Sequence, residues 1–241
     1  GALAQASGAE ASVLAGSAVS SFGGRSTLLG GSRVFVAETC EYRRHFLHFR
    51  PQAAVITSVE ADHLDYFRDH ADVLDAFLAF TRQIAEGGLL VYCADDEGAR
   101  EVARRARLEG LPLKLVPYGH AAEGPFRIDD VREEPGAVSF NLPEAGLEGL
   151  VLLVPGLHNV ANATAAIALL SEFNPAGTGP GDVRLWSEVV RDAVRGAIAD
   201  FRGSARRAEL VGEVNGVRIL DDYGHHPTAI QSTLAGIRNF Y

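Results

Sequence analysis

The sequence has very little of several residue types, and each shortage excludes something. Its 241 residues include no methionine, one tryptophan and two cysteines, and Lys114 is the single lysine among 22 basic residues. Cys40 and Cys93 show no paired spacing, so they do not predict a disulfide framework and instead indicate a reducing, cytoplasmic environment. Because not even residue 1 is a methionine, we expect that the chain does not begin at the native start.

The sequence also lacks an excess of basic charge and any long apolar run. Its formal net charge is −9, which does not favour binding to nucleic acid or to an anionic membrane surface. Residues 1–24 are rich in small side chains but contain no basic segment and no long apolar run, so they predict neither a signal peptide nor membrane insertion. With 47% apolar residues, the chain can bury one core and a small second unit.

Short apolar runs alternate with helical patterns in the first half of the chain. The runs of strand length are 34–37, 53–57, 89–93 and 113–116, and the segments with apolar residues at helical spacing are 70–86 and 97–109. This alternation predicts βαβ units, and therefore an α/β fold with a mostly parallel central sheet flanked by helices.

The pattern changes after residue 125. Three apolar runs, 126–128, 138–140 and 151–154, are separated by turns with no insert of helix length, which predicts a small antiparallel β patch. The elements expected after it are a helix over 159–173, a Gly/Pro loop over 174–181 and a helix over 186–199.

An Asn-Gly pair at residues 215–216 lies between the apolar runs 209–214 and 217–220. This arrangement is a strong signal for a β-hairpin. We expect a domain boundary near Arg207, so that residues 1–207 form one domain. Residues 208–241 are too few to be a domain by themselves.

Polar residues follow two of the predicted strands. Glu38 comes directly after the run 34–37, and His63 comes shortly after the run 53–57. Ligands of open parallel sheets bind beyond the carboxyl ends of neighbouring strands, so Glu38 and His63 could together hold divalent cations that neutralise phosphate charge. Alternatively, Glu38 is a solvated loop acid and His63 a turn or capping residue, since Mg²⁺ prefers oxygen ligands to imidazole. A nucleophilic Cys40 is a further hypothesis, although the sequence pairs no histidine with it.

His158, Asn159 and Asn162 open the helix expected after Gly156. Asparagine is a favoured N-cap, which accounts for one of the two asparagines. It does not account for the second, because asparagine is a mediocre helix former within the first turn. A side-chain amide donates and accepts at once, as recognition of an adenine edge requires. Helix capping and nucleotide recognition both remain open for these residues.

The segment 221–228 places two acids, one aromatic residue and two histidines in eight positions. Asp222 follows a predicted strand, where its carboxylate could accept hydrogen bonds from both hydroxyls of a ribose. The two histidines could instead be core residues with a fixed tautomer. Arg206 and Arg207 precede the hairpin, where they could bind phosphates or be surface charges before a linker.

Four segments, in this order, resemble those of the Mur ligase family. They are Val36 to Glu38 with Phe46-Leu47, Ile56 to Tyr66, Pro155 to Ala163, and Asp221 to Thr228, and the second is similar to the family's alanine-adding branch. The resemblance implies a central ATP-binding domain over residues 1–207 and the beginning of the C-terminal ligase domain, a second α/β domain, over residues 208–241.

The family joins an amino acid to a carboxylate in peptidoglycan-precursor synthesis, after ATP has phosphorylated that carboxylate. For the alanine-adding branch, the resemblance implies UDP-N-acetylmuramate and L-alanine as small-molecule substrates, with ATP and Mg²⁺ as cofactors. The resemblance assigns metal binding to Glu38 and His63, and catalysis to His63, Tyr223 and His225. It assigns nucleotide binding to His158, Asn159, Asn162, Arg207 and Asp222.

The sequence departs from the family because it contains no Gly-Lys-Thr loop to hold the phosphates, and Lys114 lies in an apolar strand. We therefore expect a fragment that lacks this loop, the N-terminal domain and most of the C-terminal domain, and that is inactive alone. Two alternatives are the branch that recycles murein tripeptide and a non-catalytic nucleotide-binding or assembly module that has lost the loop.

Overall fold

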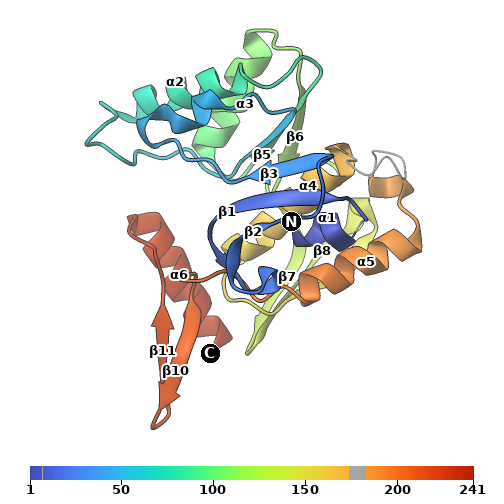
Figure 1. The fold of residues 1–241 in the computed structure, drawn as a ribbon, viewed down its shortest axis with the longest axis vertical. Helices are drawn as coiled ribbons and strands as arrows, with labels where there is room; N and C mark the ends of the chain where they lie inside the picture. The colour runs from blue at the N-terminus through green and yellow to red at the C-terminus, as the bar shows by residue number, and fades with distance from the viewer. Residues whose placement is uncertain (7, 174–182) are drawn as a thin grey trace.

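The computed structural model describes residues 1–6, 8–173 and 183–241 (Figure 1). Its central feature is a parallel sheet in the order β4-β5-β6, built from Ala53–Ile56, Leu89–Cys93 and Lys114–Tyr118. Ala53 pairs with Leu89, which pairs with Lys114, so the three strands begin at one level. The prediction of an α/β fold around a parallel sheet is confirmed.

Helices cover both faces of this sheet. α3 (Glu97–Leu108) packs on β5 with α2 (His70–Thr81) beside it, and α4 (Leu157–Phe173) crosses all three strands from the other side (Figure 1). Leu90, Val91 and Ile167 are fully buried, and because successive strand residues point to opposite faces, β5 contributes to the core on both sides of the sheet. The core therefore lies on both faces, under α4 on one side and under α2 and α3 on the other.

The helix α2 ends at Thr81, five residues before the end predicted from the apolar spacing. The backbone amides of Gln83 and Ile84 still bond to α2, but the amide of Ala85 donates to Pro51 just before β4. A Cβ on Gly88 would lie 2.6 Å from the carbonyl oxygens of both Ala85 and Gln52. The chain leaves the helix early because it must pass this close to the segment before β4.

A second sheet, in the order β2-β1-β3, contains Arg25–Leu28, Ala11–Val19 and Val34–Ala37. β1 is parallel to β3 and antiparallel to β2. The sequence pattern does not predict β1, because the strand is rich in alanine, serine and glycine. β3 bonds to β1 and β4 bonds to β5, so β3 lies outside the central parallel sheet, although Val34 and Val36 line one cavity with Val55 and Thr57.

The antiparallel patch is confirmed as β7 (Asp129–Glu134), β8 (Ala137–Leu142) and β9 (Leu147–Leu152). Its first strand lies three residues later than predicted. Phe126 and Ile128 are buried core residues before the strand, and Arg127 forms a single bridge with Gly119. α5 (Glu188–Ala199) packs on β9. The Gly/Pro loop expected over 174–181 lies outside the described residues.

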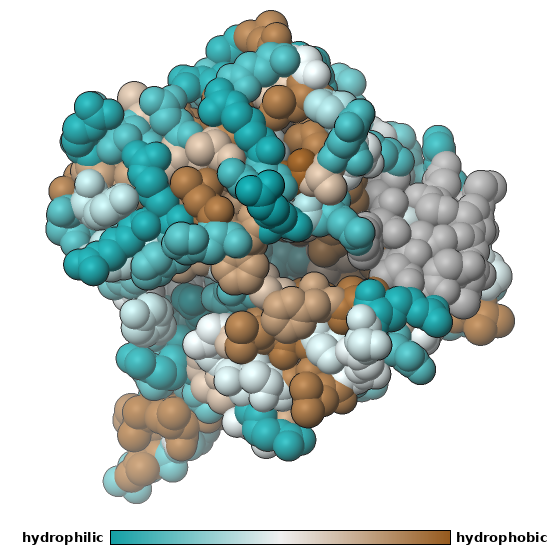
Figure 2. Space-filling view, turned by 45° about the horizontal axis from the view of Figure 1, so that its top comes forward, coloured by the Kyte–Doolittle hydropathy of each residue, from teal (hydrophilic) through white to brown (hydrophobic). Residues whose placement is uncertain are grey.

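The C-terminal segment is a hairpin followed by a helix. β10 (Glu209–Val214) and β11 (Val217–Asp221) are joined by Asn215 and Gly216, whose φ angles of 51° and 78° are those of the predicted turn. α6 (Pro227–Phe240) follows, and the sequence pattern does not predict it. The hairpin projects from the body, and apolar side chains gather on that projection in Figure 2.

α6 approaches the start of α4 very closely. A Cβ on Gly236 would lie only 2.5 Å from the Cα of Gly156, so two backbones touch at this point. The remaining elements are short: α1 (Ala2–Ala6) and the 3₁₀ turns η1 (Ser20–Phe22), η2 (Tyr42–His48), η3 (Pro143–Ala145) and η4 (Val183–Leu185). Within the part of the chain that the structure describes, we find no helix with the length and apolarity needed to cross a membrane.

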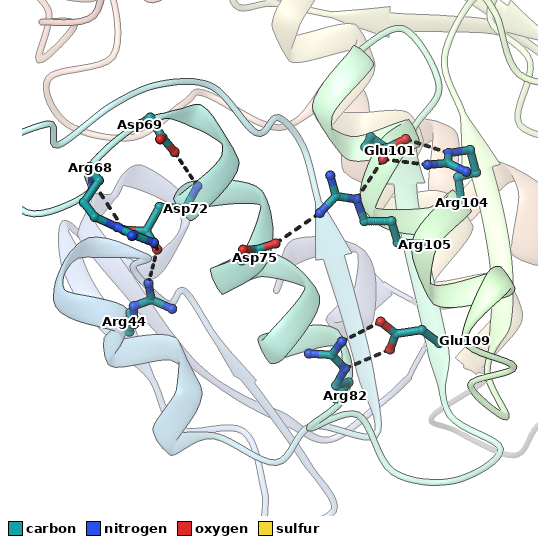
Figure 3. A network of polar contacts seen from close by, with 10 residues as sticks. All are labelled: Arg44, Arg68, Asp69, Asp72, Asp75, Arg82, Glu101, Arg104, Arg105 and Glu109. Carbon is teal, nitrogen blue, oxygen red and sulfur yellow. Dashed lines mark hydrogen bonds and ion pairs between the residues drawn. The ribbon is translucent and has the colours of Figure 1, made fainter.

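Ion pairs fasten α2 to its neighbours (Figure 3). Arg105 contacts both Asp75 of α2 and Glu101 of α3, at 3.1 and 2.7 Å. Hydrogen bonds from Arg104 and Arg105 lower the pKa of Glu101 to about 2. Arg44 of η2 bonds to Asp72 at 2.6 Å, which fixes η2 against α2 and so positions the loop after β3.

Candidate functional site

The loop after β4 meets the segment before α6, although the two are far apart in the sequence. The hydroxyl of Thr228 donates to Oε2 of Glu60 at 2.8 Å, and Nδ1 of His226 lies 3.4 Å from the same oxygen. Nε2 of His225 lies 3.8 Å from Oδ2 of Asp62. The structure therefore joins two of the polar segments that the sequence singled out.

His63 occupies a tight turn and directs its ring toward acids. Its φ is 54°, and its amide donates to Oδ1 of Asp62 at 2.6 Å. The ring nitrogen Nε2 lies 3.4 Å from Oε1 of Glu41 and 4.0 Å from Oδ2 of Asp62, and the ring of Tyr42 packs 4.7 Å away. The backbone of His63 therefore forms a turn, which is one of the roles that the sequence left open. Its imidazole remains able to bind a ligand.

Glu38 points toward β1. Its Oε2 accepts a hydrogen bond from the amide of Gly16 at 2.8 Å. In the described parts of the chain no hydrogen bond or ion pair joins Glu38 to His63. Burial raises the pKa of the Cys40 thiol, and the charges of Glu41, Glu38 and Asp62 add to that rise, while a hydrogen bond from the amide of Tyr42 opposes it. A metal site shared by Glu38 and His63 stays a prediction.

The start of α4 is tied together by its own polar groups. Nδ1 of His158 lies 3.1 Å from the hydroxyl of Ser232 in α6, and the side-chain amide of Asn159 donates to the carbonyl of Pro155 at 2.8 Å. Burial lowers the pKa of His158, and Asp222 and Arg207 act on it with opposite signs. His158 is therefore a neutral ring held at the contact between α4 and α6.

Asn162, three and four residues after Asn159 and His158, is exposed and lines a cavity of about 220 Å³ whose other walls include Val34, Val36 and Thr57. His158 and Asn159 do not line this cavity. The structure therefore places three of the five residues predicted for nucleotide binding, His158, Asn159 and Asn162, at the start of α4, and of these three only Asn162 lines this cavity.

Asp222 connects two turns. Its Oδ2 accepts from the amide of Ala208 and its Oδ1 from the amide of Gly224, each at 2.7 Å. Both carboxylate oxygens thus hold the backbone on either side of the hairpin. A role in binding ribose would require other lone pairs of the same oxygens or an exchange of these bonds.

Two arginines and a histidine surround Tyr223. The guanidinium carbons of Arg206 and Arg207 lie 5.0 and 5.8 Å from the centre of its ring. The ring of His225 packs edge-on at 5.4 Å. Because Tyr223 is half exposed, this group presents two fixed positive charges to solvent beside the loop of Glu60 and Asp62.

Sequence reasoning missed several residues of this region. Glu41, rather than Glu38, is the acid nearest to His63, and Ser232 is the partner of His158. Glu60 and Thr228 connect the two segments. The polar run at residues 60–62 and the composition of 221–228 are the only signals that could have indicated this last contact.

Comparisons with known proteins show the family to which the chain belongs. Residues 26–170 match the family described as Mur ligase middle domain, and residues 206–241 match the Mur ligase, glutamate ligase domain. The chain is 44% identical over 232 residues to a UDP-N-acetylmuramate–L-alanine ligase of Treponema pallidum (strain Nichols), covering 96% of this chain and 47% of that protein. A protein of the same name from Arthrobacter sp. (strain FB24) is 43% identical over 210 residues, which is 87% of this chain and 41% of the relative.

Solved structures share the fold. The UDP-N-acetylmuramate-alanine ligase of Thermotoga maritima has a TM-score of 0.72 at 22% identity, covering 99% of this chain and 50% of that one. A murein peptide ligase of Psychrobacter arcticus has a TM-score of 0.67 at 23% identity, covering 98% and 50%. The chain spans about half the length of the curated relatives it matches. Because the middle-domain match covers residues 26–170, more than half of the chain, the protein belongs to the Mur ligase family.

Proposed function

We propose that this chain is the part of an ATP-dependent ligase that joins L-alanine to UDP-N-acetylmuramate. Two curated relatives with that name are 44% and 43% identical to it. The observation that carries the proposal is the meeting of the loop 60–63 with the segment 223–228. It gathers imidazoles, carboxylates and two arginines where a phosphorylated carboxylate would need both charge and orientation.

The reaction consists of two substitutions. The carboxylate of UDP-N-acetylmuramate attacks the γ-phosphorus of ATP, ADP leaves, and an acyl phosphate forms. The amine of L-alanine then attacks the acyl carbon, inorganic phosphate leaves, and the amine loses a proton. Negative charge accumulates on phosphate oxygens in the first step, so fixed cations and hydrogen-bond donors accelerate it.

Arg207, Tyr223 and His225 would serve the first substitution. Arg207 supplies a permanent positive charge and, together with Arg206, is held against the ring of Tyr223. Nδ1 of His225 lies 3.2 Å from the carbonyl oxygen of Tyr223, which can only accept, so Nδ1 carries a proton there. The ring is thereby held with Nε2 toward the loop of Asp62, 3.8 Å from its carboxylate, where it would face a phosphate oxygen. The hydroxyl of Tyr223 would add a second donor.

The residues that we propose for binding the nucleotide are His158, Asn159, Asn162, Arg207 and Asp222. The fit to ATP is partial for two of them. The oxygens of Asp222 already accept from two backbone amides, and the amide nitrogen of Asn159 donates to Pro155. The carbonyl oxygen of Asn159 and the exposed amide of Asn162 remain suitable for recognising an adenine edge.

The fit of Glu38 and His63 to one Mg²⁺ ion is incomplete. Mg²⁺ prefers oxygen ligands in octahedral geometry. The carboxylate of Glu38 is bonded to Gly16, and His63 lies with Glu41 and the Cys40 thiol. Glu38 uses one carboxylate oxygen for Gly16, and among the described residues no contact joins it to His63, so we derive no step of the reaction from a metal held by these two residues.

The proposal is tested by measuring phosphate release in a longer parent protein that contains these residues. Release should require ATP, UDP-N-acetylmuramate and L-alanine together. His225→Ala should lower turnover by about 10²-fold or more, the usual effect of losing a positioned donor. His120→Ala, at an exposed histidine after β6, is the matched control and should leave turnover unchanged.

Three outcomes decide between the proposed function and its two alternatives. Release with L-alanine supports the proposal, and release with murein tripeptide in place of L-alanine supports the recycling branch. No release with either acceptor would indicate a non-catalytic module. The 241-residue chain alone contains no Gly-Lys-Thr sequence, and we expect it to release no phosphate.

A further inference from the structure

Cys40, Glu41 and His63 form a cluster with the composition of a site for a soft or borderline metal ion. The thiol sulfur, a carboxylate oxygen of Glu41 and a ring nitrogen of His63 lie within 4.8 Å of one another. We propose that these three side chains bind a divalent cation such as Zn²⁺, with a water molecule in the fourth position.

The spacing suits tetrahedral coordination. Nε2 of His63 and Oε1 of Glu41 are 3.4 Å apart. Ligands at zinc bond lengths of about 2.0–2.3 Å are separated by roughly 3.3–3.8 Å in a tetrahedron, so this pair needs almost no movement. The sulfur of Cys40 must approach by about 1 Å, which a rotation of its exposed side chain can supply.

Neighbouring groups hold the cluster in place. The amide of Tyr42 donates to the sulfur of Cys40 at 3.4 Å, an interaction that a metal-bound thiolate would retain. The ring of Tyr42 packs 4.7 Å from that of His63, and its hydroxyl donates to Asp65 at 2.9 Å. Tyr42 therefore restrains both the thiol and the imidazole, as outer-shell residues of metal sites do.

The charge around the thiol favours a cation. Carboxylate oxygens of Glu41 and Asp62 lie 3.4 and 4.0 Å from Nε2 of His63, and that of Glu41 lies within 4.8 Å of the thiol sulfur. Among the described residues, Glu41 forms an ion pair with His63 alone, and the nearby Arg44 is paired with Asp72. A dication would compensate this concentration of negative charge.

The donor set also selects the kind of ion. A thiolate and an imidazole favour Zn²⁺ and Co²⁺, whereas Mg²⁺ and Ca²⁺ favour oxygen alone. The site is inferred without reference to the proposed ligase function, but it shares His63 with the residues that the family resemblance assigns to that function. An ion held by Nε2 of His63 would remove this nitrogen from any other role.

Cobalt supplies a direct test on the 241-residue chain. Titration with Co²⁺ should give one equivalent of tetrahedral cobalt, seen as intense visible bands and a sulfur-to-cobalt charge-transfer band in the near ultraviolet. Zn²⁺ should displace the cobalt and abolish both. Absence of the charge-transfer band, or its saturation only at several equivalents, would overturn the proposal.

Variants identify the ligands. Cys40→Ser, at an exposed position, should lose the charge-transfer band, and His63→Gln and Glu41→Gln should each weaken Zn²⁺ binding by at least about tenfold in isothermal titration. Cys93→Ala is the matched control: it removes the other cysteine, which is buried in β5, and should leave the band intact. A band that survives in Cys40→Ser, or that disappears in a folded Cys93→Ala protein, would contradict the assignment. Neither result depends on ligase activity, so failure here leaves the proposed function untouched.

Discussion

Replacing Gly236 with alanine should loosen the contact between α6 and the start of α4. A Cβ at this position would lie 2.5 Å from the Cα of Gly156 and 2.7 Å from its nitrogen. Both are backbone atoms, so no side-chain rotation can relieve the overlap. The two segments must separate by about 1 Å to reach an ordinary carbon–carbon contact of about 3.5 Å.

Two opposing effects set the change in the free energy of unfolding that Gly236→Ala causes. Alanine within a helix is more stable than glycine by about 0.5–1 kcal/mol, while overpacking a buried contact costs about 1–3 kcal/mol. Gly196 in α5 separates these effects, because a Cβ there would meet nothing within 4 Å. Gly196→Ala should therefore stabilise the protein by about 0.5–1 kcal/mol, and Gly236→Ala should be less stable than Gly196→Ala by about 1–3 kcal/mol.

Urea unfolding of both variants measures this difference. Hydrogen exchange of residues 227–240 reports the docking of α6 directly, and it should become faster in Gly236→Ala but remain unchanged in Gly196→Ala. If Gly236→Ala were as stable as Gly196→Ala and protected α6 equally well, the backbone contact at Gly156 would not be tight and the reasoning would fail.

Three further predictions concern the same C-terminal region. Asp222→Ala leaves the amides of Ala208 and Gly224 without their acceptor, and it should lower the free energy of unfolding by about 1–3 kcal/mol in thermal denaturation, with Asp222→Asn losing less. Burial lowers the pKa of His158, so the unfolded chain takes up a proton first as the pH falls below the ordinary value of 6.5. The stability contributed by the neutral ring is then complete above that pH and is lost on acidification. The free energy of unfolding should therefore fall less between about pH 7.5 and about pH 5.5 in His158→Gln than in the unchanged protein. Gly216→Ala, at a φ of 78°, should cost about 1 kcal/mol in the same thermal assay, and an unchanged midpoint would contradict the assigned turn.

Much of the fold could be predicted because its strands are dense in valine, isoleucine and leucine. β4, β5 and the hairpin lie where the sequence places them. β1 could not be found, since alanine, serine and glycine give no strand signal. The pairing of β3 with β1 was equally hidden, because strand neighbours depend on contacts that local patterns do not contain.

The candidate site could be predicted as a set of segments but not as a set of contacts. The order of the motifs indicated that residues 60–63 and 221–228 belong to one region. It could not reveal which of two acids close in sequence, Glu38 or Glu41, faces His63, because that depends on how the loop turns after β3. Nor could it show that Asp222 already serves the backbone.

The two bonds of Asp222 also have a mechanical consequence. One side chain closes the hairpin at its base, joining Ala208 before β10 to Gly224 after β11. The arginines at 206–207 and the ring of Tyr223 are thereby fastened to opposite ends of a single closed loop. Any displacement of the hairpin must carry both groups together, so their mutual spacing is preserved wherever the hairpin moves.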